Sequence, residues 1–275
     1  MGPPRDGSAA IPSTPYGGWS RRAAGIGASR VPQLTAWFWV VKLLTTGMGE
    51  TTWDFSAVAL GPVPAVVLSG SGFVVALSIQ LRSGVYRPWV YWFAVLMVSV
   101  FGTTAADAVH VVLGVPYAVS SVAFLVAVLA TFALWRRVEG TLSMHSIRTP
   151  RREIFYWSAV VLTFALGTAA GDLTATTLGL GYPGSTALFA VLFAVPALLA
   201  WRGKGDVAAF WVAYVFTRPL GASAADWLGV SPARGGVGVG TGPVSLVALL
   251  GIAAVVAYLS ISGVDREETA PVVYP

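Results

Sequence analysis

The chain has 275 residues, of which 56% are hydrophobic and 11% are charged, and its net charge is +5. Soluble domains carry about 25% charged residues, so this sequence has too few to cover a surface in water, and a soluble globular domain is excluded. It has no cysteine, which excludes disulfides, thiolate metal sites and thiol catalysis. Residues 1–30 are rich in Gly, Pro, Ser and Arg, lack the apolar core of a signal peptide and predict a disordered tail.

Eight apolar spans follow, each near the ~20 residues that cross a hydrocarbon core as a helix. They lie at about 34–60, 62–81, 87–114, 116–136, 152–179, 184–201, 207–228 and 242–262, and residues 265–275 form a second tail. Apart from Lys42, Arg218 and Arg234, every basic residue lies before the first span, after the last, or in alternate connections. The positive-inside bias therefore predicts that both termini are cytoplasmic. It also explains the net charge, so no nucleic-acid partner is expected.

Several tryptophans lie near the expected inner boundary of the membrane. We interpret them as interfacial anchors, because indole rings favour the headgroup region of a bilayer. They are Trp89, Trp92, Trp135, Trp157 and Trp201.

The odd-numbered spans share one motif, Trp-x9-Gly-x4-Asp, which occurs four times. Its tryptophans are Trp39, Trp92, Trp157 and Trp211, its glycines are Gly49, Gly102, Gly167 and Gly221, and its aspartates are Asp54, Asp107, Asp172 and Asp226. The chain has only seven aspartates, so four of the seven at one repeat position exclude coincidence. We expect the glycines to allow close helix packing.

Each repeat contains two spans, so all copies cross the membrane in the same direction. The repeats cover about 34–81, 87–136, 152–201 and 207–262, within a transmembrane domain of 31–264. The predicted fold is an all-α membrane protein with eight transmembrane helices, arranged as four parallel two-helix repeats in a pseudo-fourfold bundle. The odd spans would line the centre, and the even spans would face lipid. A nested pseudo-twofold packing is the alternative.

The repeated aspartates lie about 22 Å along the helix from their tryptophans, in the outer half of the membrane. Each ionisable group there costs about 2.5–3.5 kcal/mol, and such groups usually face a cavity or a bound ion. We therefore predict a cation site made by the four aspartates and Glu50, one helical turn before Asp54. Hydroxyls and one imidazole nearby are supporting candidates: Thr51, Thr103, Thr104, Thr168, Ser223 and His110. Lys42 and Arg218 would tune the charge.

Carboxylate and hydroxyl oxygens without thiolates favour hard ions such as Mg²⁺, Ca²⁺ or Mn²⁺, and His110 tips the preference to manganese. The predicted function is transport of a divalent cation. Export is favoured because the acids lie nearer the outer face. Whether the cation is exchanged for protons is left open. In the alternative, the protein is a scaffold that transports nothing, and its aspartates are struts that hydrogen-bond between helices. No enzymatic activity and no cofactor are expected, since zinc-protease, Ser-His and two-histidine haem patterns are absent from the spans.

Four runs around the motif resemble a bacterial family of uncharacterised membrane-anchored proteins. They are Lys42–Glu50, Phe101–Asp107, Leu166–Asp172 and Arg218–Asp226. The resemblance covers about residues 34–262 and implies the same repeat in a multi-pass protein of the bacterial inner membrane. It implies no substrate.

Overall fold

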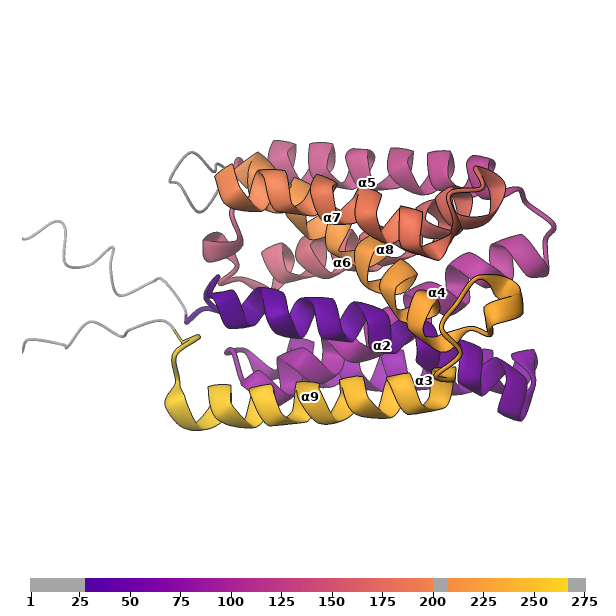
Figure 1. The fold of residues 1–275 in the computed structure, drawn as a ribbon. Helices are drawn as coiled ribbons and strands as arrows, with labels where there is room; N and C mark the ends of the chain where they lie inside the picture. Colours follow the sequence, from indigo (N-terminus) through magenta and orange to yellow (C-terminus); the bar gives the residue numbers. More distant parts are fainter. Residues whose placement is uncertain (1–27, 200–206, 267–275) are drawn as a thin grey trace, which may run out of the picture.

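The computed structural model describes residues 28–199 and 207–266, which form helices and no strands (Figure 1). Most of the two expected tails, and the end of the sixth span with Trp201, lie outside these residues. The long helices are α2 (Ala36–Leu60), α3 (Pro62–Ser83), α4 (Pro88–Val111), α5 (Tyr117–Glu139), α6 (Pro150–Asp172), α7 (Gly181–Leu199), α8 (Val207–Gly229) and α9 (Thr241–Ser262). The shorter elements are η1 (Met144–Ser146), a π-helical turn η2 (Leu173–Thr177) that continues α6, and η4 (Pro232–Arg234).

The helix boundaries follow from residues that start or stop a helix. Thr35 and Thr149 accept hydrogen bonds from Phe38 N and Arg152 N, and so cap α2 and α6. Prolines occupy the first turn of α3, α4 and α6, where no backbone N–H is lost. Gly140 ends α5 with a φ of 74°, a left-handed conformation that glycine adopts without strain.

Six of the eight long helices in the described part of the chain are long and apolar enough to cross a membrane. They are α3, α4, α5, α6 with its π-helical turn, α7 and α9. The other two, α2 and α8, contain charged residues of the central motif region, among them Lys42, Glu50 and Arg218. The chain is therefore an all-helical, multi-pass membrane protein.

Four helices, α2, α4, α6 and α8, form a closed inner ring, and these are the helices that carry the repeated motif. Contacts run from α2 to α4, from α4 to α6, from α6 to α8 and from α8 back to α2. The other four helices lie outside this ring. Three of them pack mainly on the inner helix that follows in the chain, α3 on α4, α5 on α6 and α7 on α8, and α9 packs mainly on α2. Only 17–22% of each outer span is buried, against 61% and 67% for α4 and α6.

The motif glycines lie where neighbouring inner helices touch. A Cβ added to Gly49 on α2 would overlap Ser99 on α4, and one added to Gly102 would lie 2.7 Å from Phe164 Cβ on α6. A Cβ on Gly167 would overlap Arg218 on α8, and one on Gly221 would overlap Thr46 on α2. Each glycine thus contacts the next inner helix in the same rotational sense. The expected packing role of the glycines agrees with these contacts.

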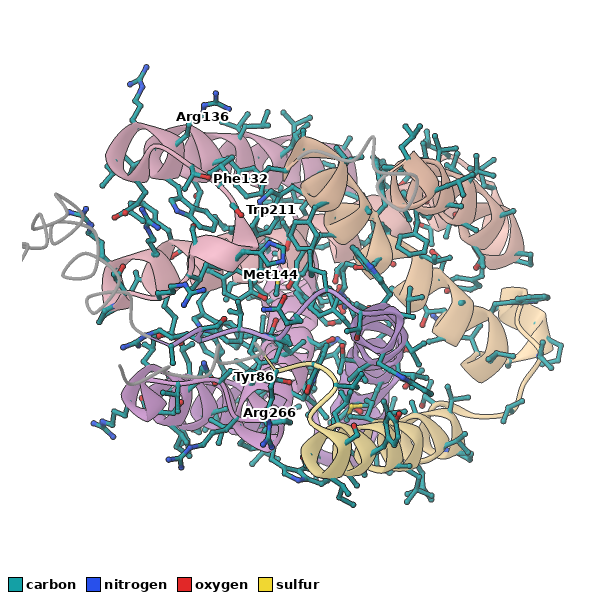
Figure 2. All side chains as sticks on the ribbon, turned by 90° about the vertical axis from the view of Figure 1, so that its left-hand side faces the viewer. Tyr86, Phe132, Arg136, Met144, Trp211 and Arg266 are labelled. Atoms are coloured by element: carbon teal, nitrogen blue, oxygen red, sulfur yellow. The ribbon has the colours of Figure 1, made fainter. Side chains whose placement is uncertain are left out.

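One end of the ring is covered by a layer that we call the basic-end cap, made of residues 28–35, 84–87, 140–149 and 263–266. Glu153, fully buried at the start of α6, accepts hydrogen bonds from Arg30 and Gln80. Tyr86 donates to Asp265. Viewed from this end, Met144 lies near the middle of the bundle (Figure 2). Arg30 and Asp265, which fall within the expected tails, are therefore bound to the rest of the bundle, Arg30 at α6 and Asp265 within the basic-end cap.

The interpretation of the tryptophans as interfacial anchors is wrong for three of them. Trp92, Trp135 and Trp157 are 1%, 0% and 2% exposed. The basic-end cap covers this end of the ring, so these rings pack against other aromatic side chains; Trp135, for example, lies 5.7 Å from the Trp211 ring. Trp89, by contrast, is 52% exposed, as an anchor requires.

Glycine substitutions on α6 test the ring packing. In Gly167→Ala the new methyl group would overlap Arg218 and lie 2.9 Å from Pro219 Cδ, so we expect a loss of about 1–3 kcal/mol in the free energy of unfolding. Gly171→Ala, one turn away, places its methyl group 3.7 Å from the nearest atom and should be neutral or stabilising. Unfolding of the purified variants in detergent measures both. Equal stability of the two variants would contradict the ring packing.

Candidate functional site at the centre of the inner ring

The centre of the ring is occupied by Arg218, which extends from α8 and is 1% exposed. Its Nη1 donates to the carbonyl oxygen of Thr46 on α2 at 2.6 Å. Its Nη2 donates to Thr168 Oγ1 on α6 at 2.8 Å and to the hydroxyl of Thr103 on α4. One guanidinium therefore contacts all three of the other inner helices.

Arg218 also forms a buried ion pair with Glu50. The distance from Arg218 Nη2 to Glu50 Oε2 is 2.7 Å, and the two side chains are 1% and 5% exposed. Glu50, Thr103 and Thr168 each directly follow a motif glycine, so the glycines bring their backbones close to the guanidinium. Two charges in such surroundings are tolerated only when each has a partner. The charge-tuning role expected for Arg218 is consistent with this pair.

Asp54, Asp107 and Asp172 each lie four residues, about 6 Å along the helix, after a residue that binds Arg218. Asp226 occupies the equivalent position on α8. All four are on the side of Arg218 that is away from the basic-end cap. Each interacts electrostatically with Glu50, and Asp107, Asp172 and Asp226 also interact with Arg218. Asp226 is 6% exposed, and its Oδ1 has no hydrogen-bond partner among the described residues. Asp172 lies where α6 becomes π-helical, a departure from α geometry that is frequent at functional sites. The aspartates therefore form one acidic layer.

This acidic layer is not a preformed metal centre. Within residues 28–199 and 207–266, no three His, Asp or Glu side chains lie close enough together to hold a metal ion. The aspartates interact through space without converging on one point. Direct coordination of a cation by several of them would require the side chains or the helices to move, or water molecules to complete the coordination shell.

The supporting candidates occupy different positions. Thr103 and Thr168 bind Arg218, as described above, whereas Thr104 donates to its own helix at Val100 O, 2.9 Å away. Thr51 accepts from Ser245 on α9 at 2.7 Å. Ser223 is 3% exposed, and its hydroxyl has no partner in the described part of the chain. Of the hydroxyl candidates, only that of Ser223 is buried and uncommitted.

His110, at the end of α4, is oriented by the α4–α5 connection and the first residue of α5 and not by the aspartates. Its Nδ1 lies 2.8 Å from Val115 O, and its ring stacks on Tyr117 with 3.6 Å between centroids. One ring nitrogen is thus engaged by a backbone carbonyl. The structure does not bring this imidazole together with the acidic layer as a ligand set.

Lys42 lies between Arg218 and the basic-end cap, and it is 1% exposed. Its Nζ has no hydrogen-bond partner among the described residues and lies over two rings, 3.8 Å from the centroid of Phe164 and 4.1 Å from that of Tyr214. The faces of aromatic rings attract cations. Lys42 therefore contacts aromatic faces, whereas the carboxylate of Glu50 pairs with Arg218.

Beyond the acidic layer, Arg218 and Lys42, the ring contains a further layer of side chains that the sequence analysis did not predict. The residue before each motif tryptophan is aromatic and buried: Phe38, Tyr91, Tyr156 and Phe210. The Tyr91 and Tyr156 hydroxyls are hydrogen-bonded to each other, and the Phe38 and Phe210 rings are 6.3 Å apart. These side chains form an aromatic layer between Lys42 and the basic-end cap. Extending the motif by one position, to Phe/Tyr-Trp, would have found it.

Comparisons with known proteins identify the repeat but no activity. A family model described as a repeat of unknown function (DUF347) matches residues 90–141, 155–206 and 209–264, together more than half of the chain. The matched segments contain the second, third and fourth copies of the motif, whereas the first copy lies outside them. No curated protein and no solved structure matches the chain.

A double-mutant cycle tests the central ion pair. Glu50→Gln or Arg218→Met alone leaves a buried charge without its partner and should lower the free energy of unfolding by about 3–5 kcal/mol. The double variant should be much more stable than the sum of the two losses predicts, because neither charge remains. Denaturant unfolding in detergent provides the free energies.

Lys42→Met supplies the control for this cycle, because it removes a buried cation that does not pair with Glu50. Its coupling to Glu50→Gln should stay within about 0.5 kcal/mol of additivity. Additive losses in the Glu50–Arg218 cycle, or equal coupling in both cycles, would contradict the assignment of Arg218 as the partner of Glu50.

Proposed function

Because this chain belongs to the DUF347 repeat family, whose function is unknown, its activity has to be inferred from its own residues, and we propose that it is a membrane transporter of a cation. The substrate proposed is a divalent metal such as manganese, moved outward through the inner ring. The observation that carries this proposal is the acidic layer: four motif aspartates and Glu50 interact with one another inside the bundle. A stability role alone does not account for several carboxylates at this depth, because each costs free energy there.

The charges of the ring centre support a cation as substrate. Five carboxylates and two basic groups, Lys42 and Arg218, give a formal excess of three negative charges. The charge of Glu50 is already neutralised by Arg218, so the excess negative charge lies on the aspartates. A divalent cation, protons, or both in exchange would offset it.

The spacing of the acids favours a cation that keeps part of its hydration shell. Mg²⁺-like ions give up water reluctantly and are commonly held through one or two carboxylates with several waters. Such an ion needs no cluster of three protein ligands, which is consistent with the geometry of the described residues. Asp226 Oδ1 and Ser223 Oγ, both buried and without a hydrogen-bond partner among the described residues, are the atoms proposed to face it first.

In the proposed mechanism, Arg218 is the internal counter-ion of an empty site. With no cation bound, its guanidinium holds Glu50 and the hydroxyls of Thr103 and Thr168. An arriving cation would compete for these oxygens and displace the guanidinium. On the other side of Arg218, the aromatic layer and the basic-end cap close the ring, so passage would require both to open.

We also propose how the chain lies in the membrane. All eight long helices cross it as four parallel two-helix repeats about a pseudo-fourfold axis, in the inner membrane of a bacterium. The cyclic glycine contacts support the fourfold arrangement over a nested twofold one. The positive-inside bias supports cytoplasmic placement of the basic-end cap and of both termini, so that the acidic layer faces outward.

One observation favours the second candidate, a scaffold that transports nothing. Arg218 donates hydrogen bonds to three neighbouring helices, as a structural strut does. In that case the acidic layer would bind no ion, and replacing its aspartates would change only stability. The two functions therefore differ in what a metal ion does to the purified protein.

A thermal-stability panel with Mn²⁺, Mg²⁺, Ca²⁺ and Zn²⁺ tests the proposed function. A ligand of the folded state raises the melting temperature by mass action, and we expect the largest rise with Mn²⁺. Asp107→Asn and Asp226→Asn should remove most of this rise. Asp265→Asn, which removes the same charge at the basic-end cap, should keep it.

Flux measurements complete the test. Liposomes that contain wild-type protein should accumulate or release the stabilising metal, and those that contain Asp107→Asn should not. A wild-type melting temperature that no metal changes, together with no flux, would overturn the transporter proposal and favour the scaffold.

A further inference from the structure

Two grooves on the outside of the bundle occupy equivalent places in the repeat. The α5–α8 groove has a volume of about 620 Å³ and lies between α5 and α8, with Leu166 of α6 in its lining. The α3–α6 groove, of about 390 Å³, lies between α3 and α6. In both, the inner helix lines the groove with the motif tryptophan, Trp211 or Trp157, and with residues at −3, +1, +4 and +5 from it. The repeat therefore builds the same kind of groove twice.

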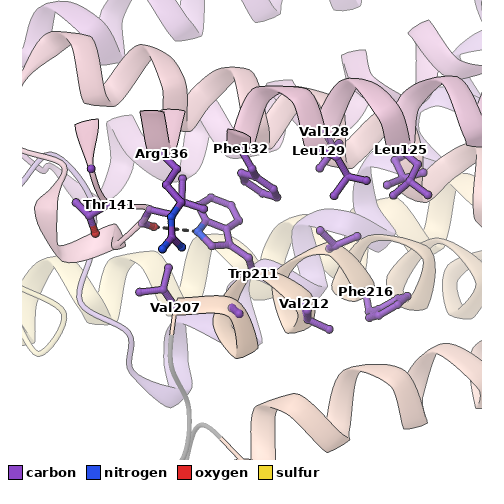
Figure 3. Close-up of a pocket in the computed structure, with 15 residues that line it drawn as sticks. Leu125, Val128, Leu129, Phe132, Arg136, Thr141, Val207, Trp211, Val212 and Phe216 are labelled. Carbon is purple, nitrogen blue, oxygen red and sulfur yellow. Dashed lines mark hydrogen bonds between the residues drawn. The ribbon is translucent and has the colours of Figure 1, made fainter. Parts of the chain in front are cut away.

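The two grooves differ in charge. The lining of the α3–α6 groove contains no ionisable side chain, whereas Arg136 lies at one end of the α5–α8 groove. Its side chain extends from α5 toward Trp211 and Thr141 (Figure 3). The nearby Arg151 and Arg152 both pair with Glu139, but the guanidinium of Arg136 makes no hydrogen bond or ion pair with any residue that the structure describes. The guanidinium of Arg136 is thus the one charged group among the described residues that line this groove.

The dimensions of the α5–α8 groove match one leaflet of a bilayer. Along α5 it runs from Leu125 to Arg136, a rise of about 16 Å at 1.5 Å per residue. Half of a ~30 Å hydrocarbon core is about 15 Å. Arg136 lies at the end of the bundle that carries the basic-end cap, next to Arg137 and the arginines at the start of α6. The groove therefore extends from the expected headgroup level to the expected middle of the membrane.

We propose that the α5–α8 groove binds one anionic phospholipid of the cytoplasmic leaflet. Its phosphate is bound by Arg136, and one acyl chain lies against Leu129, Phe132 and Val212. Guanidinium and phosphate form strong, charge-assisted hydrogen bonds, and basic pockets between helices on the cytoplasmic side suit anionic headgroups. The bound lipid fills the space between α5 and α8 that the contacts of Phe132 and Trp135 with Trp211 leave open. This site is independent of the acidic layer and of the proposed transport.

Native mass spectrometry of the purified full chain tests the site, with phosphatidylglycerol and phosphatidylcholine of identical acyl chains as probes. One arginine near a membrane surface contributes about 1 kcal/mol toward an anionic lipid, so we expect about a fivefold preference for phosphatidylglycerol. Arg136→Gln should bring the two lipids to parity. Arg137→Gln, which removes the neighbouring charge outside the groove, should keep the preference.

A third variant separates a groove site from general surface charge. Leu129→Trp fills the groove without changing any charge, and it should lower the retention of both lipids severalfold. Equal binding of the two lipids by the wild type would overturn the proposal. So would an equal loss of preference in Arg136→Gln and Arg137→Gln, or unchanged retention by Leu129→Trp.

Discussion

The arrangement of the four inner helices depends on the interactions of one group, the guanidinium of Arg218. It lies inside a ring of four helices, pairs with Glu50 and donates to groups on each of the other three inner helices. Removing Glu50 would leave this buried charge without its ion-pair partner, which is strongly destabilising. The positions of α2, α4 and α6 relative to α8 are therefore constrained by one side chain, and any movement of these helices has to break or exchange its bonds.

The motif glycines make this arrangement possible, because they allow the inner helices to approach more closely than a Cβ at these positions would permit. Gly49, Gly102 and Gly167 each directly precede a residue that binds Arg218. In these three repeats the glycine thus allows close packing, and the residue after it contacts the guanidinium. The fourth copy differs, since Ala222 follows Gly221 and the arginine itself comes from this helix. The ring is symmetric in its backbone packing and asymmetric in its chemistry.

Along the ring axis, charged and aromatic levels follow one another in an order that suits a state of the proposed transporter closed on the side of the basic-end cap. The acidic layer is followed by Arg218, then by Lys42 between aromatic rings, then by the aromatic layer and the basic-end cap. Positive groups next to the acidic layer would repel a cation that moved further without displacing them. Under the proposal, Arg218 and Lys42 would therefore act as an electrostatic barrier as well as counter-ions.

The sequence by itself determined the helical, multi-pass class, the helix boundaries to within a few residues, and the repeated glycine and aspartate positions, because span length, helix stop signals and motif spacing are local properties of the chain. It could not show that Arg218 pairs with Glu50, that Lys42 lies against Phe164 and Tyr214, or that Trp92 and Trp157 are buried. Those facts depend on how each helix is rotated and which helix it meets. Only the tertiary structure decides that, since it brings residues more than 100 positions apart into contact.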